Sequence, residues 1–176
     1  AGEPGDALRG GDDPLLPRAA VAPRFVPASQ NDLGPSGAKA RYRANVEAIR
    51  LIHDLNSTGR PTSPDGQRVL ARWSSWGAIP EVFDDLKPEW DAERAELREL
   101  LSDDEWDAAE RTTINAHYTD PMIARQVWRL LDGLGFRGGA VLEPGSGSGT
   151  FIGLAPESAQ MTGVELDPLT AAISAA

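Results

Sequence analysis

The 176-residue chain contains no cysteine, and this absence removes several classes of protein from consideration. Without cysteine there is no disulfide framework, no zinc cluster with thiolate ligands and no cysteine nucleophile. The chain also has no apolar run of the roughly 18–20 residues that a membrane-spanning helix needs, and its N-terminus lacks the basic and apolar regions of a secretory signal. We therefore expect a cytoplasmic protein that uses neither a membrane nor a metal ion.

Positive charge is scarce as well. The chain has 17 basic residues against 27 acidic ones, which gives a net charge of −10. A self-sufficient DNA-binding domain normally has a basic surface, because the neutralisation of phosphates supplies much of its affinity. Contact with nucleic acid would therefore have to come from a local basic patch or from sequence outside these residues.

The composition divides the chain into three parts. Residues 1–35 are rich in Gly, Pro, Ala and Asp without sustained periodicity, which predicts a disordered leader, with Phe25 and Val26 docking where the fold begins. Residues 36–114 show the apolar spacing of helices, and residues 115–176 carry two short apolar runs typical of strands. We expect a helical region followed by the first βαβ unit of a parallel α/β domain.

Several helix boundaries are marked by capping residues. Ser63 precedes Pro64, Ser102 and Glu105 form a capping box, and Asp120 precedes Pro121. The last of these helices has an apolar stripe that we expect to be buried, formed by Ile123, Val127, Leu130, Leu131 and Leu134.

Two features of the helical region have alternative interpretations. Trp73 and Trp76 are expected to lie in a small core, although tryptophans near an arginine can also stack on bases. Lys39, Arg41 and Arg43 form the most basic segment together with Arg50, and a solvated helix face is the first interpretation, with phosphate contact as the second.

The segment "AVLEPGSGSGTFIG" at residues 140–153 places three glycines within five positions, directly after a predicted strand over 139–143. Such a turn lets the backbone approach a ligand closely. A P-loop needs a lysine after the last glycine, but no lysine follows Lys87. A dinucleotide fingerprint needs glycine where Thr150 stands, which weakens that interpretation.

S-adenosylmethionine is the third ligand class, and it carries an ammonium group and a cationic sulfur. Glu143, at the end of the first strand, is placed to face that positive charge. Glu165 ends the second predicted strand, over 160–165, where a carboxylate can accept both ribose hydroxyls. The alternatives are a solvent-exposed strand end for Glu143 and a helix cap shared with Asp167 for Glu165.

The motifs resemble those of one enzyme family. "VLEPGSGSGTFIG", "GVELDP" and "NAHYTDPMIARQVW" are similar to the cofactor motifs of adenine-N6 DNA methyltransferases. The stretch "SGAKARYRANVEAIRLI", with "LARWSSWGAIPEVFD", resembles the amino-terminal segment of large bacterial proteins that join such a methyltransferase to a helicase. The resemblance implies an incomplete Rossmann-like domain that binds S-adenosylmethionine and acts on DNA.

The resemblance also implies a role for individual residues. Tyr118 and Thr119 would line the methionine end of the cofactor. For His117 beside them, a local structural role is the first interpretation and a general base is the second. Leu166 would lie against the adenine ring. The remaining positions, which would shape the methionine and ribose pocket or hold the ribose, are Glu143, Gly145, Gly147, Phe151 and Glu165.

One departure from the family pattern limits what this chain is expected to do alone. The family holds the target adenine with an Asn or Asp, two prolines and an aromatic residue, and no such tetrapeptide follows the cofactor motifs here. We therefore expect a fragment without catalytic residues, with a folded helical part, a loose C-terminal third and no tight cofactor binding. Two other functions stay open, namely a dinucleotide-dependent oxidoreductase and a non-enzymatic interaction module with a remnant cofactor fold.

Overall fold

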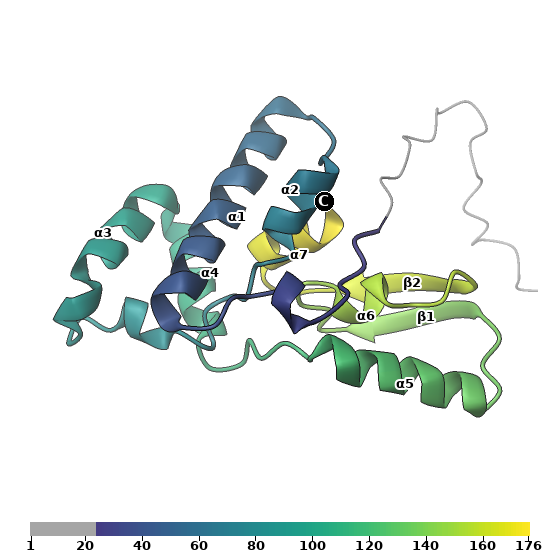
Figure 1. Ribbon diagram of the computed structural model, residues 1–176. Helices are drawn as coiled ribbons and strands as arrows, with labels where there is room; N and C mark the ends of the chain where they lie inside the picture. The colour runs from purple at the N-terminus through teal and green to yellow at the C-terminus, as the bar shows by residue number, and fades with distance from the viewer. Residues whose placement is uncertain (1–23) are drawn as a thin grey trace, which may run out of the picture.

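The computed structural model describes residues 24–176, so the disorder expected for residues 1–23 falls outside the described residues. The described part is a mixed α/β structure with seven α-helices and one parallel two-stranded sheet. Figure 1 shows the helical region at one end of the molecule and the sheet at the other. The α-helices of the helical region are α1 (Ala38–Thr58), α2 (Pro64–Leu70), α3 (Asp91–Leu100) and α4 (Asp103–Thr112).

Local capping explains where these helices begin and end. The Ser63 side chain accepts a hydrogen bond from the Gly66 backbone at the start of α2, and the capping box of Ser102 and Glu105 opens α4, as predicted. Helix α1 ends at Gly59, whose φ of 65° suits a residue without a side chain. Three short 3₁₀ turns complete the region, η1 (Gln30–Asp32), η2 (Pro80–Phe83) and η3 (Pro88–Trp90).

Tryptophans form the centre of the main core. Trp73 and Trp76 are each 1% exposed, and their rings meet edge to face at 5.8 Å between centroids. Trp90 and Trp106 lie in the same core, and Trp128 is buried near the sheet, so the chain's five tryptophans are all buried. Burial confirms Trp73 and Trp76 as core residues and contradicts their use as free platforms for bases.

A buried asparagine shapes the turn between these two tryptophans. The side chain of Asn45 is fully buried, donates to the Ser75 carbonyl at 2.6 Å and accepts from the Ser74 backbone at 3.0 Å. Ser75 has a φ of 53°, a left-handed conformation that is uncommon for a residue with a side chain. Asn45 therefore compensates a strained turn that directs both indole rings into the core.

Part of the basic segment on α1 is neutralised within the fold. Lys39 lies 2.7 Å from Glu93, and Arg50 lies 2.7 Å from Glu96, so two of its cations pair with acids on α3. The Lys39 ammonium also lies over the Trp90 ring, 4.0 Å from its centroid. These pairs favour the interpretation of a solvated helix face over phosphate contact.

The strands β1 (Gly139–Pro144) and β2 (Ala159–Val164) pair in parallel, with Glu143 opposite Gly163. A four-residue helix, α6 (Thr150–Gly153), lies between them in sequence, and α7 (Pro168–Ala175) follows β2. Leu142 on β1 and Val164 on β2 are 64% and 53% exposed, so one sheet face is left open among residues 24–176. The predicted strands and their parallel pairing are confirmed.

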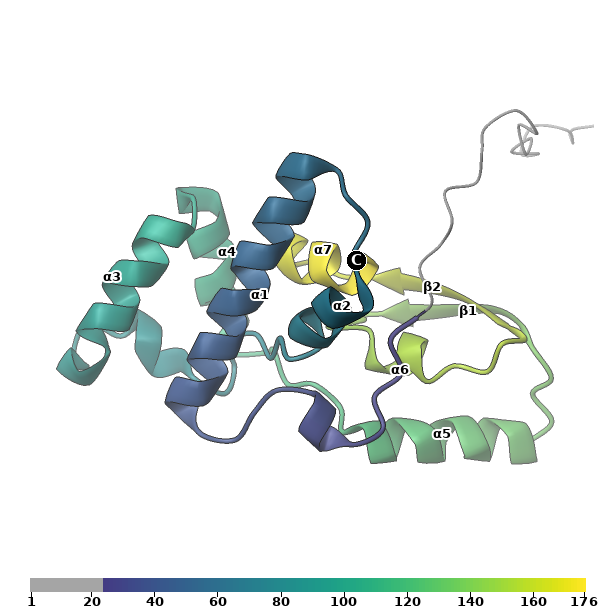
Figure 2. The ribbon, with the colours of Figure 1, turned by 45° about the horizontal axis from the view of Figure 1, so that its top comes forward.

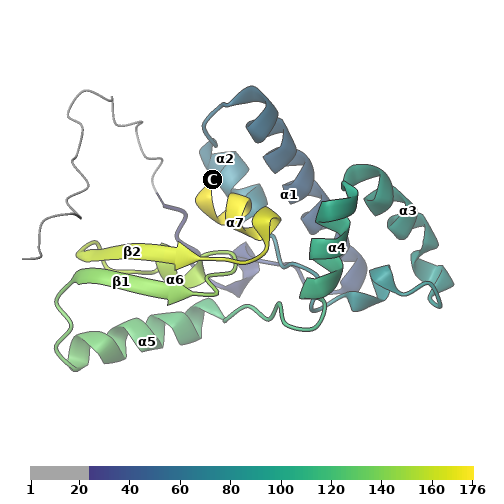
Figure 3. The same ribbon diagram turned by 180° about the vertical axis from the view of Figure 1, so that it is seen from behind.

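Helix α7 joins the two ends of the molecule. Its residues Leu169 and Ile173 are 7% and 5% exposed and belong to the same core as Trp73 and Trp76. Figure 3 shows α7 beside α4 and α1 rather than over the sheet. The helical core thus provides α7 with the apolar partners that the short sheet lacks, and the expectation of a loose C-terminal third stays a prediction.

Helix α5 (Pro121–Gly133) packs with a face that differs in part from the one predicted. Pro121, Ala124 and Trp128 are its buried residues, whereas Ile123, Leu130 and Leu134 are 58%, 61% and 76% exposed. Leu131 of the expected stripe packs against the cluster around Trp128, so the stripe is buried only in part. Spacing alone identifies residues that share a face, but the bulk of Trp128 decides which face meets the sheet.

Residues 24–35, which composition assigned to the leader, pack against α5 and α6 (Figure 2). Arg24 donates to the carbonyls of Ile152 and Ala155 at 3.0 and 3.3 Å. Arg125 on α5 donates to the Ala28 carbonyl at 2.8 Å. Phe25 is half-buried there, whereas Val26 is 57% exposed, so only Phe25 docks as expected.

Candidate functional site

The glycine-rich loop connects β1 to α6, and its backbone needs glycine at three places. Gly145, Gly147 and Gly149 have φ values of 72°, 53° and 80°, in the left-handed region that other residues rarely adopt. Most of the loop's amide groups are used within the protein. The amides of Gly145 and Ser146 donate to the Val164 carbonyl, and that of Gly149 donates to the Ser146 carbonyl.

A cavity of about 380 Å³ lies between this loop, β1, the middle of α5 and the segment that precedes α5. Its volume falls in the range of small-molecule sites. Six of the eight predicted site residues line it, namely Tyr118, Thr119, Glu143, Gly145, Gly147 and Phe151. The structure therefore brings together residues from two separated motifs, and the carboxyl end of β1 meets the loop at their centre.

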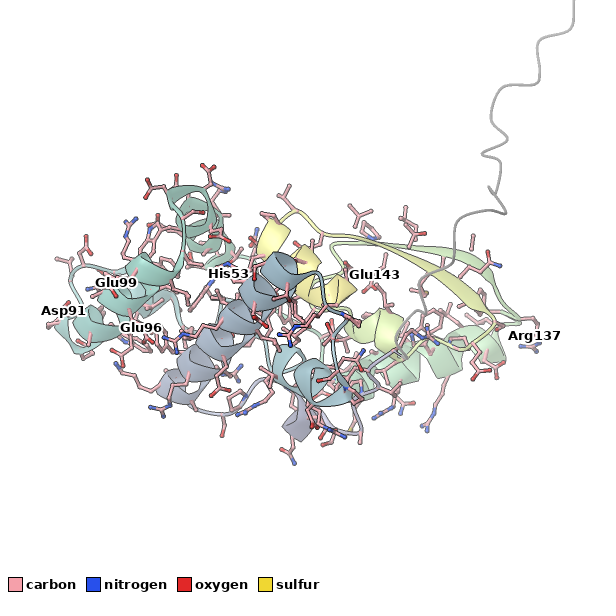
Figure 4. All side chains as sticks on the ribbon, turned by 90° about the horizontal axis from the view of Figure 1, so that it is seen from above. His53, Asp91, Glu96, Glu99, Arg137 and Glu143 are labelled. Carbon is pink, nitrogen blue, oxygen red and sulfur yellow. The ribbon has the colours of Figure 1, made fainter. Side chains whose placement is uncertain are left out.

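Glu143 is the unusual group in this cavity. Its Oε2 atom is buried without a hydrogen-bond partner among the described residues. Burial raises the pKa of Glu143 from the usual 4.5 to about 7, because the carboxylate is removed from water. Figure 4 shows Glu143 near the sheet, far from the acidic cluster of Asp91, Glu96 and Glu99 on α3. The alternative interpretation of Glu143, a solvent-exposed strand end, does not fit this partly buried side chain.

Glu165 has a different environment from the one expected for a free ribose ligand. Its Oε2 accepts a hydrogen bond from the Gly147 backbone at 2.7 Å, and its Oε1 accepts from the Asp167 backbone at 3.0 Å. The carboxylate thus ties the glycine loop to the start of α7. The N-cap of α7 is Asp167, whose side chain accepts from the Thr170 backbone at 2.8 Å.

A second hollow, of about 410 Å³, lies across the glycine loop from the first. Glu165 and Leu166 line this hollow, and Leu166 is 94% exposed. Tyr118, Gly145 and Gly147 line both hollows. The eight predicted residues therefore surround two adjoining hollows that share the loop as a common wall, rather than one pocket.

The Tyr118 ring packs against the glycine loop at Gly147. A Cβ built on Gly147 would lie 2.9 Å from Cε1 of the Tyr118 ring, so the ring fills the space beside this glycine. The Tyr118 hydroxyl accepts a hydrogen bond from Trp73 Nε1 at 3.2 Å. Burial raises the pKa of this tyrosine above its usual value, so the phenol is neutral at physiological pH.

The sequence reasoning missed Trp128 as a site residue. This side chain lines the first cavity, and its Nε1 donates to the Phe151 carbonyl at 3.0 Å, which holds α6 against α5. Phe151 packs against the cluster that contains Trp128. The available signal was the spacing of Ala124 and Trp128, which are four residues apart and therefore share one face of the helix.

His117 also lines both hollows, and its side chain is exposed. Its backbone amide donates to the Asn115 carbonyl at 3.0 Å. Within residues 24–176, no group of three His, Asp or Glu side chains could hold a metal ion, and no helix is long and apolar enough to cross a membrane. Comparison of the chain with protein-family models, curated proteins and solved structures found no significant match.

Proposed function

We propose that this chain binds S-adenosylmethionine beside Glu143, as the cofactor-binding part of a DNA adenine-N6 methyltransferase. The observation that carries the proposal is the buried Glu143 Oε2 atom, which has no hydrogen-bond partner in the described part of the chain and lies in a cavity beside a loop of bare backbone. A buried carboxylate without a partner is costly, and a ligand that brings positive charge removes that cost.

The residues of the first hollow fit the methionine end of this cofactor. Its ammonium group would pair with Glu143, and the Thr119 hydroxyl would donate to its carboxylate. Apolar side chains such as Trp128, Val141 and Met161 line the remaining wall, which suits the aliphatic chain. When bound, the cofactor supplies a methyl group activated by a cationic sulfur.

The second hollow fits the ribose and adenine. Glu165 accepts one backbone hydrogen bond on each oxygen, and a carboxylate oxygen can accept more than one. Its remaining lone pairs would accept the ribose hydroxyls. The exposed Leu166 beside it would cover one face of the adenine, so both halves of the cofactor would meet at Gly145 and Gly147.

The dinucleotide alternative is less well supported by the loop. A pyrophosphate is bound by free backbone amides, but the amides of Gly145, Ser146, Gly147 and Gly149 donate within the protein. Glu143 would in addition repel an anion. The interaction-module alternative lost its main support when the tryptophans proved to be buried.

The acceptor-base tetrapeptide is not among these residues. Methyl transfer to the exocyclic amine of adenine, by direct in-line displacement, is therefore proposed for a larger protein that contains this segment and contacts DNA elsewhere. For the chain itself the proposal is cofactor binding, with modest affinity because the sheet face at Leu142 and Val164 is open.

Isothermal calorimetry at pH 8 tests the proposal with S-adenosylmethionine and NADH as alternative ligands. We expect S-adenosylmethionine to bind the wild-type chain, and Glu143→Gln to weaken that binding about tenfold or more through loss of a charge-assisted contact. The exposed acid Asp91 on α3 provides the matched control, Asp91→Asn. Binding of NADH without S-adenosylmethionine would overturn the proposal.

A further inference from the structure

A ring of contacts connects the helical core to the glycine loop. On one side, Trp73 Nε1 donates to the Tyr118 hydroxyl at 3.2 Å, and the Tyr118 ring lies against Gly147. On the other side, the same Trp73 Nε1 donates to Thr170 Oγ1 at 3.1 Å. Thr170 Oγ1 in turn donates to the Asp167 carboxylate at 2.5 Å.

The ring closes at Gly147. The Asp167 backbone donates to Glu165 Oε1, and the Gly147 backbone donates to Glu165 Oε2 at 2.7 Å. The indole N–H of Trp73 therefore contacts two supports of the loop. One is Tyr118, whose ring packs against Gly147, and the other is the start of α7, which holds Glu165. Hydrogen bonds to a carboxylate are among the stronger ones, so Glu165 is a firm anchor for the Gly147 amide.

Trp73 has little freedom to move. It is 1% exposed, and the neighbouring turn is fixed by Asn45 through the carbonyl of Ser75 and the amide of Ser74. A rigid group that contacts two supports can set their positions relative to each other. The cofactor site of this chain is thus built partly on a residue about 70 positions upstream of its loop.

We infer that Trp73 is a positioning residue for the glycine loop, acting through its Nε1 hydrogen bonds to Tyr118 and Thr170. Because the Tyr118 ring lies against Gly147 and the α7 cap holds Glu165, which binds the Gly147 amide, loss of these hydrogen bonds loosens the loop between the two hollows. The effect on the loop is independent of the ligand, whereas the effect on ligand affinity rests on the proposed function.

The chain contains a matched control for this inference. Trp76 is also 1% exposed and touches Trp73 edge to face, but its Nε1 has no hydrogen-bond partner among residues 24–176. Trp73→Phe and Trp76→Phe therefore remove the same bulk from the same core. Only the first substitution removes hydrogen bonds that lead to the loop.

The experiment records the Gly147 amide signal by ¹H–¹⁵N NMR and its hydrogen exchange in the full chain, followed by titration with S-adenosylmethionine. With Trp73→Phe we expect the Gly147 amide to shift upfield, its exchange to quicken and the dissociation constant to rise about fivefold. With Trp76→Phe we expect the amide position to be kept and the affinity to stay within about twofold.

Tyr118→Phe and Thr170→Val provide milder variants if Trp73→Phe fails to fold, since each removes one acceptor of the same indole N–H. Each should shift the Gly147 amide in the same direction as Trp73→Phe. Equal shifts for Trp73→Phe and Trp76→Phe, or an unchanged Gly147 amide in both milder variants, would overturn the inference. If the wild-type chain does not bind S-adenosylmethionine, the proposed function fails, and the amide signal still decides the inference.

Discussion

At the residue scale, Glu143 combines a stability cost with the binding role that we propose for it. The pKa of its carboxyl rises from 4.5 to about 7 in the folded chain, so folding favours the protonated form. A group with a raised pKa destabilises the fold as the pH rises from the unfolded pKa toward the folded one. Retention of an ionisable group at this cost is typical of a functional site rather than of a structural one.

The first prediction follows from this shift. Glu143→Gln should raise the free energy of unfolding by about 1 kcal/mol above pH 7, a value discounted for solvent screening because the carboxyl is only partly buried. The gain should shrink between pH 7 and pH 4.5 and vanish below. Urea denaturation at pH 8 and pH 4 measures it, and an equal gain at both values would contradict the account.

Cofactor affinity should rise with pH, whereas the stability of the wild-type fold falls with pH. A cationic group pairs with the ionised form of Glu143, so binding should weaken as the pH falls through about 7. Calorimetry between pH 8 and pH 6 should show proton release on binding near and below pH 7, and Glu143→Gln should remove this pH dependence. A wild-type affinity that stays constant over this interval would argue against an ionised Glu143 in the complex.

At the scale of the element, Gly145 and Gly147 allow the role of the loop backbone to be separated from that of its neighbours. Both have positive φ, but a Cβ on Gly145 meets nothing within 4 Å, whereas one on Gly147 meets the Tyr118 ring at 2.9 Å. Gly147 was expected to border the ligand directly, and the structure adds a packing reason for this glycine. Its substitution alone therefore says little about ligand contact.

Gly145→Ala should cost about 1–2 kcal/mol of stability from its backbone conformation. Gly147→Ala should cost about 1–3 kcal/mol more, because the methyl group overpacks against Tyr118. Thermal denaturation of both variants measures the difference, and the double variant Gly147→Ala/Tyr118→Leu should recover part of the Gly147 cost. Equal losses in the two single variants would show that the Tyr118 contact has no energetic weight.

How far the sequence predicts this structure depends on whether the signal is local. Ser63 before Pro64 and the capping box of Ser102 predicted helix starts correctly, because capping involves only neighbouring residues. The buried face of α5 was predicted only in part, because the sheet that Trp128 meets comes from later sequence. The partners of Glu165 and the Trp73 contacts were also missed, since they join distant segments.

At the scale of the whole molecule, the two ends share one core through α7. Ile173 and Leu169 pack with Trp73 and Trp76, although 90 or more positions separate them in the chain. Hydrogen exchange should therefore show α7 protected together with α1, and more strongly than β1, whose far face is open at Leu142. Fast exchange in α7 together with slow exchange in α1 would contradict a core shared by the two ends.

The central claim is that the two hollows beside Glu143 and Glu165 bind S-adenosylmethionine. An NMR titration of the ¹⁵N-labelled full chain tests it most directly, because the method detects modest affinity and identifies the residues involved. The account predicts saturable shifts at Tyr118, Gly145, Gly147 and Leu166, with smaller shifts at α3. Glu143→Gln should reduce them strongly and NADH should not produce them. Shifts confined to other surfaces, or their absence at millimolar ligand, would contradict the account.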